Sequence, residues 1–395
     1  MNFLFLSPMF PKNYWHFCNR MKNHGVNVLA IGDMPIEAIS QELKDSVTEY
    51  CYVSDMENYD YVYRCVAYLA SKYGKIDWLE SNNEYWLELD SHLRTDFNIN
   101  TGMKQDVTQI FKTKSGMKAY YEKAGVKTAR YHLVDTLENG QKFISEVGYP
   151  VVVKPDNGVG AAATYKINND QELVDFYNKG HITQYIMEEF VNGLIISYDG
   201  IANRNHEVLF ETRHVFPQSI MNIVNGHTDM YYYSLRKIPE QLQKLGRSVV
   251  REFPVHGRFF HCEFFQLLED REGLGKKGFV LGLEVNFRPP GGICPDLMNY
   301  SCDIDVYDLW AKVILTQQSP EFKEKPYSAG FAGRRNNLNY KYSVEDLKKE
   351  FGKEIIYVKH LPKAFAAAMG DVLVVARWKT KERREEFYQK ALMTI

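Results

Sequence analysis

One strand-like segment constrains the fold strongly, because it alternates apolar and polar side chains and then stops. It reads LEVNFRPPGG, residues 283–292. Successive side chains of a strand point to opposite faces of its sheet. One face therefore receives Leu283, Val285 and Phe287, and the other receives Glu284, Asn286 and Arg288. We expect a sheet that packs one face on the core and lines a cleft with the other.

An earlier segment, FFHCEFFQLLE, places the carboxylate of Glu263 in an aromatic run. A buried charge is costly unless it is paired or binds a metal ion. A glycine-containing loop follows, so the two segments can pair as a hairpin that brings Glu263 near Glu284. With Asn286 they would form a set of hard oxygen ligands suited to Mg²⁺. The alternative is a polar strand in which a stray Glu263 pairs with Arg288.

A third feature is a strand followed by a loop of small residues. YPVVVK delivers Lys154, and PDNGVGAAAT follows with Gly158 and Gly160. Unobstructed backbone N–H groups in such a loop suit phosphate binding. An ordinary hairpin loop and a dinucleotide-binding loop are the alternatives, but the second requires a helix at once, and TYKI favours a strand. The sequence contains no G-x-x-x-x-G-K-[ST], which excludes a P-loop.

Length and composition set the wider limits. At roughly 150 residues per domain, 395 residues predict two or three domains. Hydrophobic residues make up 45% and charged residues 25%, as in globular proteins. The net charge of -2 gives no indication of a nucleic-acid or membrane partner. No apolar run approaches the roughly 18–20 residues of a membrane helix, and the N-terminus lacks a basic leader. We therefore expect a cytoplasmic protein.

The six cysteines are scattered and include no CxxC pair. This spacing supports neither zinc binding nor a disulfide framework, so we expect reduced thiols.

Strands alternate with helices over roughly residues 1–105, which predicts a parallel α/β sheet. A helix is expected from Lys114 to Ala124, with Gly125 as its C-cap. Most of the chain after residue 193 has β character, and residues beyond about 320 read as a small α+β appendage.

The order of these features is informative. Lys114 before a helix is followed by Lys154 before a small-residue loop, by a strand end MEEFVNG, by Glu263 and finally by E-x-N-x-R. Over roughly residues 1–315 this combination resembles the ATP-grasp superfamily, the fold of carboxylate–amine ligases, biotin carboxylase and carbamoyl phosphate synthetase.

The resemblance implies a mixed α/β and α+β chain with the ATP-grasp fold. A parallel-sheet, Rossmann-like pre-ATP-grasp domain would span residues 1–108, and the ATP-grasp domain 109–318. The latter would divide into a lid, 109–192, and a metal and phosphate subdomain, 193–318. The α+β appendage at 319–395 lies outside the resemblance.

The resemblance also implies roles for particular residues, with ATP and Mg²⁺ (or Mn²⁺) as cofactors. The nucleotide-binding set would be Lys114, Lys154, Gly158, Gly160, Ala161, Ala162, Glu188, Glu189 and Val191. The metal ligands would be Glu263, Glu284 and Asn286. Arg288, with Arg213, would stabilise the transferred phosphoryl group. Gly291 and Gly292 would offer N–H groups to the acceptor, after Pro289 and Pro290 end the strand.

The implied activity is that of an ADP-forming carbon–nitrogen ligase, which activates a carboxylate as an acyl phosphate for attack by an amine. Phosphoryl transfer needs positioning and charge neutralisation more than a protein nucleophile. A non-catalytic ATP-binding regulatory or scaffold protein is the alternative, and a bicarbonate-using carboxylase component is less favoured. The expected partners are a small carboxylate and an amine, such as amino acids, and a second copy in a homodimer. Neither nucleic acid nor membrane is expected.

Overall fold

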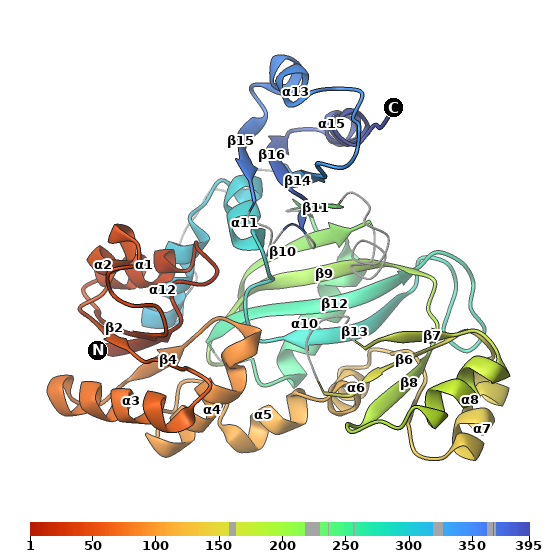
Figure 1. Ribbon diagram of the computed structural model, residues 1–395, viewed down its shortest axis with the longest axis horizontal. Helices are drawn as coiled ribbons and strands as arrows, with labels where there is room; N and C mark the ends of the chain where they lie inside the picture. Colours follow the sequence, from red (N-terminus) through yellow and green to blue (C-terminus); the bar gives the residue numbers. More distant parts are fainter. Residues whose placement is uncertain are drawn as a thin grey trace.

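The computed structural model describes residues 1–157, 163–217, 230–235, 237–255, 257–318, 327–361, 366 and 369–395. Figure 1 shows the long antiparallel sheet at the centre, with the N-terminal region on one side and a smaller sheet with its helices on the other. The C-terminal segment rises from the far edge of the long sheet.

The N-terminal region is a parallel sheet between helices, as expected. Its strand order is β3-β2-β1-β4. Phe3 and Phe5 enter one buried cluster and Leu4 and Leu6 another, because helices cover both faces of a parallel sheet. The elements are β1 (Asn2–Leu6), α1 (Trp15–Asn23), β2 (Asn27–Gly32), α2 (Gln41–Ser46), β3 (Glu49–Tyr52), α3 (Tyr59–Tyr73), β4 (Trp78–Glu80), the 3-10 helix η1 (Glu84–Trp86) and α4 (Leu87–Asp96).

The long sheet has the order β13-β12-β9-β10-β11-β14-β16-β15. Its first strands are β9 (Gly193–Ala202), β10 (Val208–Phe216), β11 (Met230–Leu235), β12 (Arg258–Leu267) and β13 (Val280–Asn286). Its helices are α5 (Gln105–Phe111), α6 (Lys114–Lys123), α10 (Glu240–Glu252), α11 (Cys294–Cys302) and α12 (Val306–Thr316). Val285 and Phe287 enter one buried cluster with α10 residues, so the apolar face predicted for this strand does pack on the core.

Helix α6 packs directly on β13, which fixes the position of Lys114 relative to the strand. Gly282 permits this contact, because a side-chain carbon there would lie 2.5 Å from the ring of Tyr121. The Gly282 N–H donates to the Lys127 carbonyl at 2.8 Å. The predicted helix from Lys114 is confirmed; it ends at Lys123 with Ala124 as its C-cap, one residue earlier than expected, and Gly125 follows with φ +70°.

The smaller sheet has the order β5-β8-β6-β7. Two helices pack on it through Phe143, Leu173 and Phe176. The elements are β5 (Tyr131–Leu133), α7 (Leu137–Val147), β6 (Val151–Pro155), β7 (Tyr165–Ile167), α8 (Asp170–Asn178) and β8 (Tyr185–Glu189).

The C-terminal segment extends the long sheet, since β14 pairs with β11 over the whole length of β11. Its elements are β14 (Ser328–Arg334), α13 (Val344–Phe351), β15 (Ile355–His360), β16 (Val372–Trp378) and α15 (Lys381–Ala391). Among the described residues, no helix is both long enough and apolar enough to cross a membrane.

A buried ionic network connects the N-terminal region to the long sheet. Glu80 at the end of β4 accepts from Arg258 of β12 at 2.7 Å and from Arg94 of α4 at 3.1 Å. Asp90 lies 3.7 Å from Arg94 and accepts from Ser81. Burial raises the pKa of Asp90 to about 6, so this carboxyl is the poorly stabilised member of the network.

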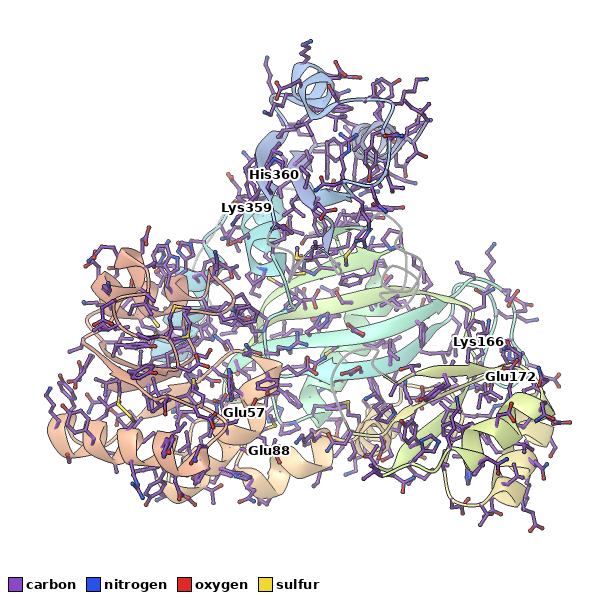
Figure 2. All side chains as sticks on the ribbon, in the orientation of Figure 1. Glu57, Glu88, Lys166, Glu172, Lys359 and His360 are labelled. Carbon is purple, nitrogen blue, oxygen red and sulfur yellow. A yellow bond between two sulfur atoms is a disulfide. The ribbon has the colours of Figure 1, made fainter. Side chains whose placement is uncertain are left out.

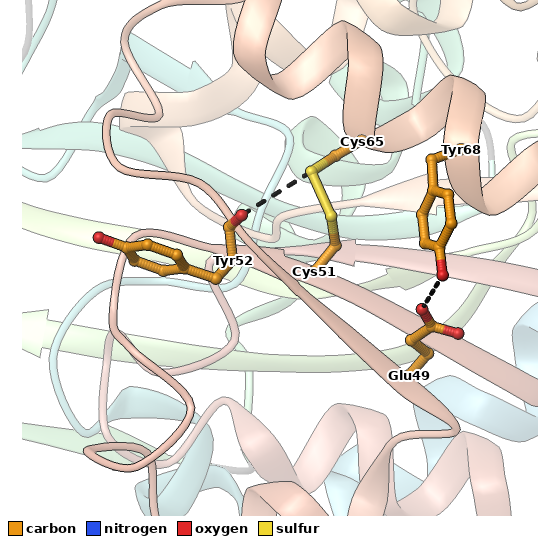
Figure 3. Close-up of a disulfide and its surroundings, with 5 residues drawn as sticks. All are labelled: Glu49, Cys51, Tyr52, Cys65 and Tyr68. Atoms are coloured by element: carbon orange, nitrogen blue, oxygen red, sulfur yellow. Dashed lines mark hydrogen bonds between the residues drawn. A yellow bond between two sulfur atoms is a disulfide. The ribbon is translucent and has the colours of Figure 1, made fainter.

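The expectation of reduced thiols is wrong for two of the cysteines. Cys51 of β3 and Cys65 of α3 form a disulfide with a Cα–Cα distance of 6.3 Å, within the usual range. Figure 3 shows the bond joining strand to helix, beside the Glu49–Tyr68 hydrogen bond. The spacing of the two cysteines gave no signal, because only the fold brings β3 and α3 together.

Candidate functional site

Two acidic side chains face each other across β12 and β13. Glu263 is paired with Glu284, and Cys262 with Val285, so the predicted hairpin is confirmed. A β-bulge follows Glu263, a feature common next to active sites. Asn286 lies on the same face and donates to Glu284 Oε1 at 3.4 Å, which leaves its amide oxygen available to a cation.

The charge balance of this pair fits a divalent cation. Burial raises the pKa of Glu284, and the carboxylates of Glu263 and Glu84 raise it further. Burial also opposes ionisation of Glu263, but His261 outweighs it and holds that pKa low. Within the described ranges, no three His, Cys, Asp or Glu side chains form a metal-binding group. Two carboxylates and an amide are a set that Mg²⁺ completes with water and phosphate oxygens.

The two lysines predicted to bind phosphate interact electrostatically with each other and with Glu284. Asp156, just after β6, accepts from the Ser115 N–H at 2.8 Å and from its hydroxyl at 2.6 Å. This contact ties the start of α6 to the end of β6 and so brings Lys114 towards Lys154. Burial and Lys154 lower the pKa of Lys114, whereas Glu284 opposes the shift.

The end of β8 carries two carboxylates that point to opposite faces of the strand. Glu188 is ion-paired with Lys118 at 2.7 Å and with Lys154 at 2.5 Å. Glu189 is ion-paired with Arg130 at 2.7 Å. Val191 is buried in a small apolar cluster. Glu188 is therefore the carboxylate on the side of Lys154, one of the two lysines predicted to bind phosphate.

Arg288 lies beyond the end of β13 and contacts the N-terminal region. It donates to the Pro289 carbonyl at 3.0 Å and forms an ion pair with Glu84 of η1. Burial disfavours its charge, but Glu84 more than offsets this and raises the pKa of Arg288.

A cavity of about 650 Å³ lies between the N-terminal region and β13. Its wall includes Glu284 and Asn286 together with Glu84, Tyr85 and Trp86 of η1. The loop after β4 lies at the carboxyl end of a parallel strand, next to β1, where the strand order reverses. Ligands of open α/β sheets bind at such points. Figure 2 shows Glu57 and Glu88, two further lining residues, on the side of the N-terminal region that faces the long sheet.

Arg213 does not join this cluster, contrary to expectation. It alternates along β10 with His214, which faces Asp199, so Arg213 points to the opposite side of the sheet. There burial lowers its pKa, and Arg384 of α15 lowers it further. Gly158, Gly160, Ala161 and Ala162, the predicted phosphate loop, lie outside the described residues.

Sequence reasoning missed a buried polar band next to Glu263. Asp199 of β9 contacts His214 at 2.7 Å and His261 at 2.5 Å, and His261 contacts Glu263 at 2.9 Å. Burial opposes the charge of both imidazoles, but the neighbouring groups raise the pKa of His261 to about 10 and that of His214 to about 9. The signal was the H-x-E spacing on β12, which places His261 and Glu263 on one face.

Known proteins share parts of this sequence. A family model described as "Carbamoyl-phosphate synthase L chain, ATP binding domain" matches residues 113–193, which include α6 and the smaller sheet. D-alanine--D-alanine ligase B of Clostridium perfringens is 30% identical over 187 residues, which are 45% of this chain and 57% of that protein. The chain spans between 6% and 57% of the lengths of four curated relatives that it matches.

Solved structures share the whole architecture. The L-amino acid ligase of Bacillus licheniformis superimposes with a TM-score of 0.73 at 17% identity, over 100% of this chain and 98% of its own. The biotin carboxylase domain of the 2-oxoglutarate carboxylase of Hydrogenobacter thermophilus, in complex with MgADP, gives a TM-score of 0.71 at 15% identity, over 98% and 89% of the two chains. The chain therefore has the ATP-grasp fold, and the resemblance inferred from its motifs is confirmed.

Proposed function

We propose that this protein is an ADP-forming ligase that activates a small carboxylate as an acyl phosphate and transfers the acyl group to an amine. The observation that carries the proposal is the pairing of Glu263 with Glu284 on a polar sheet face, with Asn286 hydrogen-bonded to Glu284 and with Lys114 and Lys154 in electrostatic contact with Glu284. The matched ATP-binding family model and the ligases with the same fold support it.

In this proposal Lys114 and Lys154 bind nucleotide phosphates, and the loop with Gly158, Gly160, Ala161 and Ala162 covers them. Glu188 would contribute its side chain to the nucleotide pocket, and Glu189 and Val191 would contribute backbone groups. These assignments follow the order of the family's motifs, and the electrostatic effect of Lys154 on Lys114 agrees with them.

Glu263, Glu284 and Asn286 would hold Mg²⁺, which neutralises phosphate charge when bound. Arg288 would place its guanidinium against charge that develops on the transferred phosphoryl group. Gly291 and Gly292 would donate N–H groups to the acceptor. This chemistry requires no nucleophile from the protein. The substrate carboxylate attacks the γ-phosphorus of ATP and ADP leaves, and the amine then attacks the acyl carbon and phosphate leaves.

The cavity beside η1 is the candidate substrate pocket in this proposal. It combines apolar lining from Trp86 and Phe287 with carboxylates, a mixture typical of small-molecule sites. An amino acid, which carries both an ammonium group and a side chain, matches this lining.

A screen for ADP release tests the proposal. The purified chain with Mg·ATP is supplied with pairs of amino acids and small carboxylic acids, and products of active pairs are identified by mass spectrometry. We expect ADP formation that depends on both a carboxylate and an amine. Bicarbonate as the only carboxyl donor would indicate the carboxylase alternative. Tight ATP binding without turnover under any pair would favour the non-catalytic alternative.

The same proposal includes the domain division at residues 1–108, 109–318 and 319–395, a homodimer and a cytoplasmic location. The Cys51–Cys65 disulfide weighs against the last of these, because such bonds are rare in the cytosol.

A further inference from the structure

The buried polar band of Asp199, His214 and His261 lies beside Glu263, one of the proposed metal ligands. Its contacts run without a break across the three strands β9, β10 and β12. Asp199 is directly opposite His261 in the β9–β12 register, and Ser197 is opposite Glu263. Asp199 Oδ2 accepts from the Ser197 hydroxyl at 2.5 Å and from His214 Nδ1 at 2.7 Å. Asp199 Oδ1 is left for His261 Nδ1 at 2.5 Å. Asp199 is fully buried, so it anchors the imidazole of His261 rigidly.

The second ring nitrogen of His261 contacts Glu263, one of the proposed metal ligands. This atom, Nε2, lies 2.9 Å from Glu263 Oε1. The side chain of Glu263 keeps 24% of its surface exposed, whereas that of His261 keeps 5%. One carboxylate oxygen of Glu263 is therefore directed inward to His261, while part of the side chain stays exposed next to Glu284, its partner in the β12–β13 register.

We propose that His261 is a positioning residue, anchored by Asp199, which holds Glu263 Oε1 so that Oε2 is presented to the divalent cation. The inference rests on the proposed function, since it concerns the cation that accompanies the nucleotide. A carboxylate free to rotate could offer either oxygen or both, and fixing one of them reduces the entropy lost when the cation binds. Outer partners of metal ligands contribute typically 10–100-fold to metal affinity or activity.

Two substitutions of His261 separate positioning from packing. A glutamine amide nitrogen can occupy the place of Nε2 and donate to Glu263, whereas an asparagine amide nitrogen reaches only the place of Nδ1 and donates to Asp199. The readout is the dissociation constant of Mn²⁺, measured by electron paramagnetic resonance with the full chain and saturating ADP. His24→Gln is the matched control, because it alters an exposed histidine–aspartate pair with Asp308.

We expect His261→Asn to weaken Mn²⁺ binding about 10- to 100-fold, while His261→Gln and His24→Gln stay within about 3-fold of the wild type. ADP affinity without metal should be unchanged in all three. Equal Mn²⁺ binding by His261→Asn and the wild type would overturn the inference, as would equal losses in the asparagine and glutamine variants.

Circular dichroism and thermal melting establish that each variant is folded. If His261→Asn is not folded, His261→Leu provides the same test, because leucine fills the same buried position and has no group that can donate to Glu263. A loss of Mn²⁺ affinity in His261→Leu supports the inference, and wild-type affinity overturns it. Absence of Mn²⁺ binding to the wild type with ADP would overturn the proposed function itself, a result distinct from equal binding by all variants.

Discussion

Arg288, just beyond β13, is ion-paired with Glu84 of η1, so the N-terminal region supplies the counter-ion for the guanidinium at the end of the polar strand face. Both side chains are largely buried, with 13% and 22% of their surfaces exposed. The pair connects the wall of the cavity to the residue proposed to stabilise the phosphoryl group. An occupant of the cavity would therefore contact the group that orients Arg288.

Replacing Glu84 by glutamine should lower kcat for ADP release about 10- to 100-fold, because small misplacements of a positioning group have effects of that order. KM for ATP should change little, since Glu84 lies on the N-terminal side of the site. Glu345→Gln, which removes an exposed pair with Lys348, is the control. A rise in the KM for ATP with unchanged kcat would contradict the assigned position of Arg288.

Glu284→Gln should fold normally and lose about 100- to 1000-fold in Mg²⁺-dependent turnover, the range for removal of one electrostatic stabiliser. The pKa of Glu284 is raised in the folded state, so the neutral acid is favoured there. Stability from this group is lost as pH rises through the folded pKa, and a neutral glutamine should melt at the same or a higher temperature at pH 7. Unchanged turnover would remove Glu284 from the proposed metal site.

Glu188→Gln should lower the free energy of unfolding by about 3 kcal/mol at pH 7. Burial disfavours the Glu188 carboxylate, but Lys154 and Lys118 outweigh it and lower its pKa from 4.5 to about 2. This stabilisation is complete above the unfolded pKa and is lost as pH falls towards 2. Urea unfolding should therefore give a constant difference from the wild type between pH 7 and 5. A difference that already shrinks over that interval would show that Glu188 is not ion-paired.

Two substitutions in the buried network of β4 and α4 should act in opposite directions. Glu80→Gln removes the partner of Arg94 and Arg258 and should destabilise the protein by about 3–5 kcal/mol, the usual cost of leaving buried charges unpaired. Asp90→Asn should be neutral or stabilising at pH 7, because burial raises the pKa of Asp90 to about 6. Chemical denaturation of both variants provides the measurement. Equal destabilisation would contradict the assignment of Glu80 as the essential counter-ion.

The disulfide predicts that the number of titratable thiols rises when the protein is reduced. In the described structure Cys18, Cys262, Cys294 and Cys302 carry thiols, and Cys51 and Cys65 form one bonded pair. A thiol reagent added to the unfolded chain should therefore titrate four groups before reduction and six after it. Six thiols without reductant would show that the pair is reduced under the conditions of purification.

The alternating strand 283–288 and the carboxylate at 263 determined, from sequence alone, that two acidic groups and an amide would meet on one sheet face. Strand pleating makes this outcome local, since residues two apart must share a face. The order of the lysines and carboxylates along the chain was likewise sufficient to predict the ATP-grasp fold.

Tertiary structure decided the contacts that join distant segments. Neither the Glu84–Arg288 pair nor the Asp199 anchor of His261 has a periodicity in the sequence, because their members come from different strands and helices whose packing sets the distance. Arg213 lies outside the candidate site because His214, its neighbour on β10, occupies the face that contacts Asp199. The disulfide forms because α3 packs against β3. The alternation of side chains along a strand can be predicted from the local sequence, whereas the register between strands far apart in sequence is set only when the whole core packs.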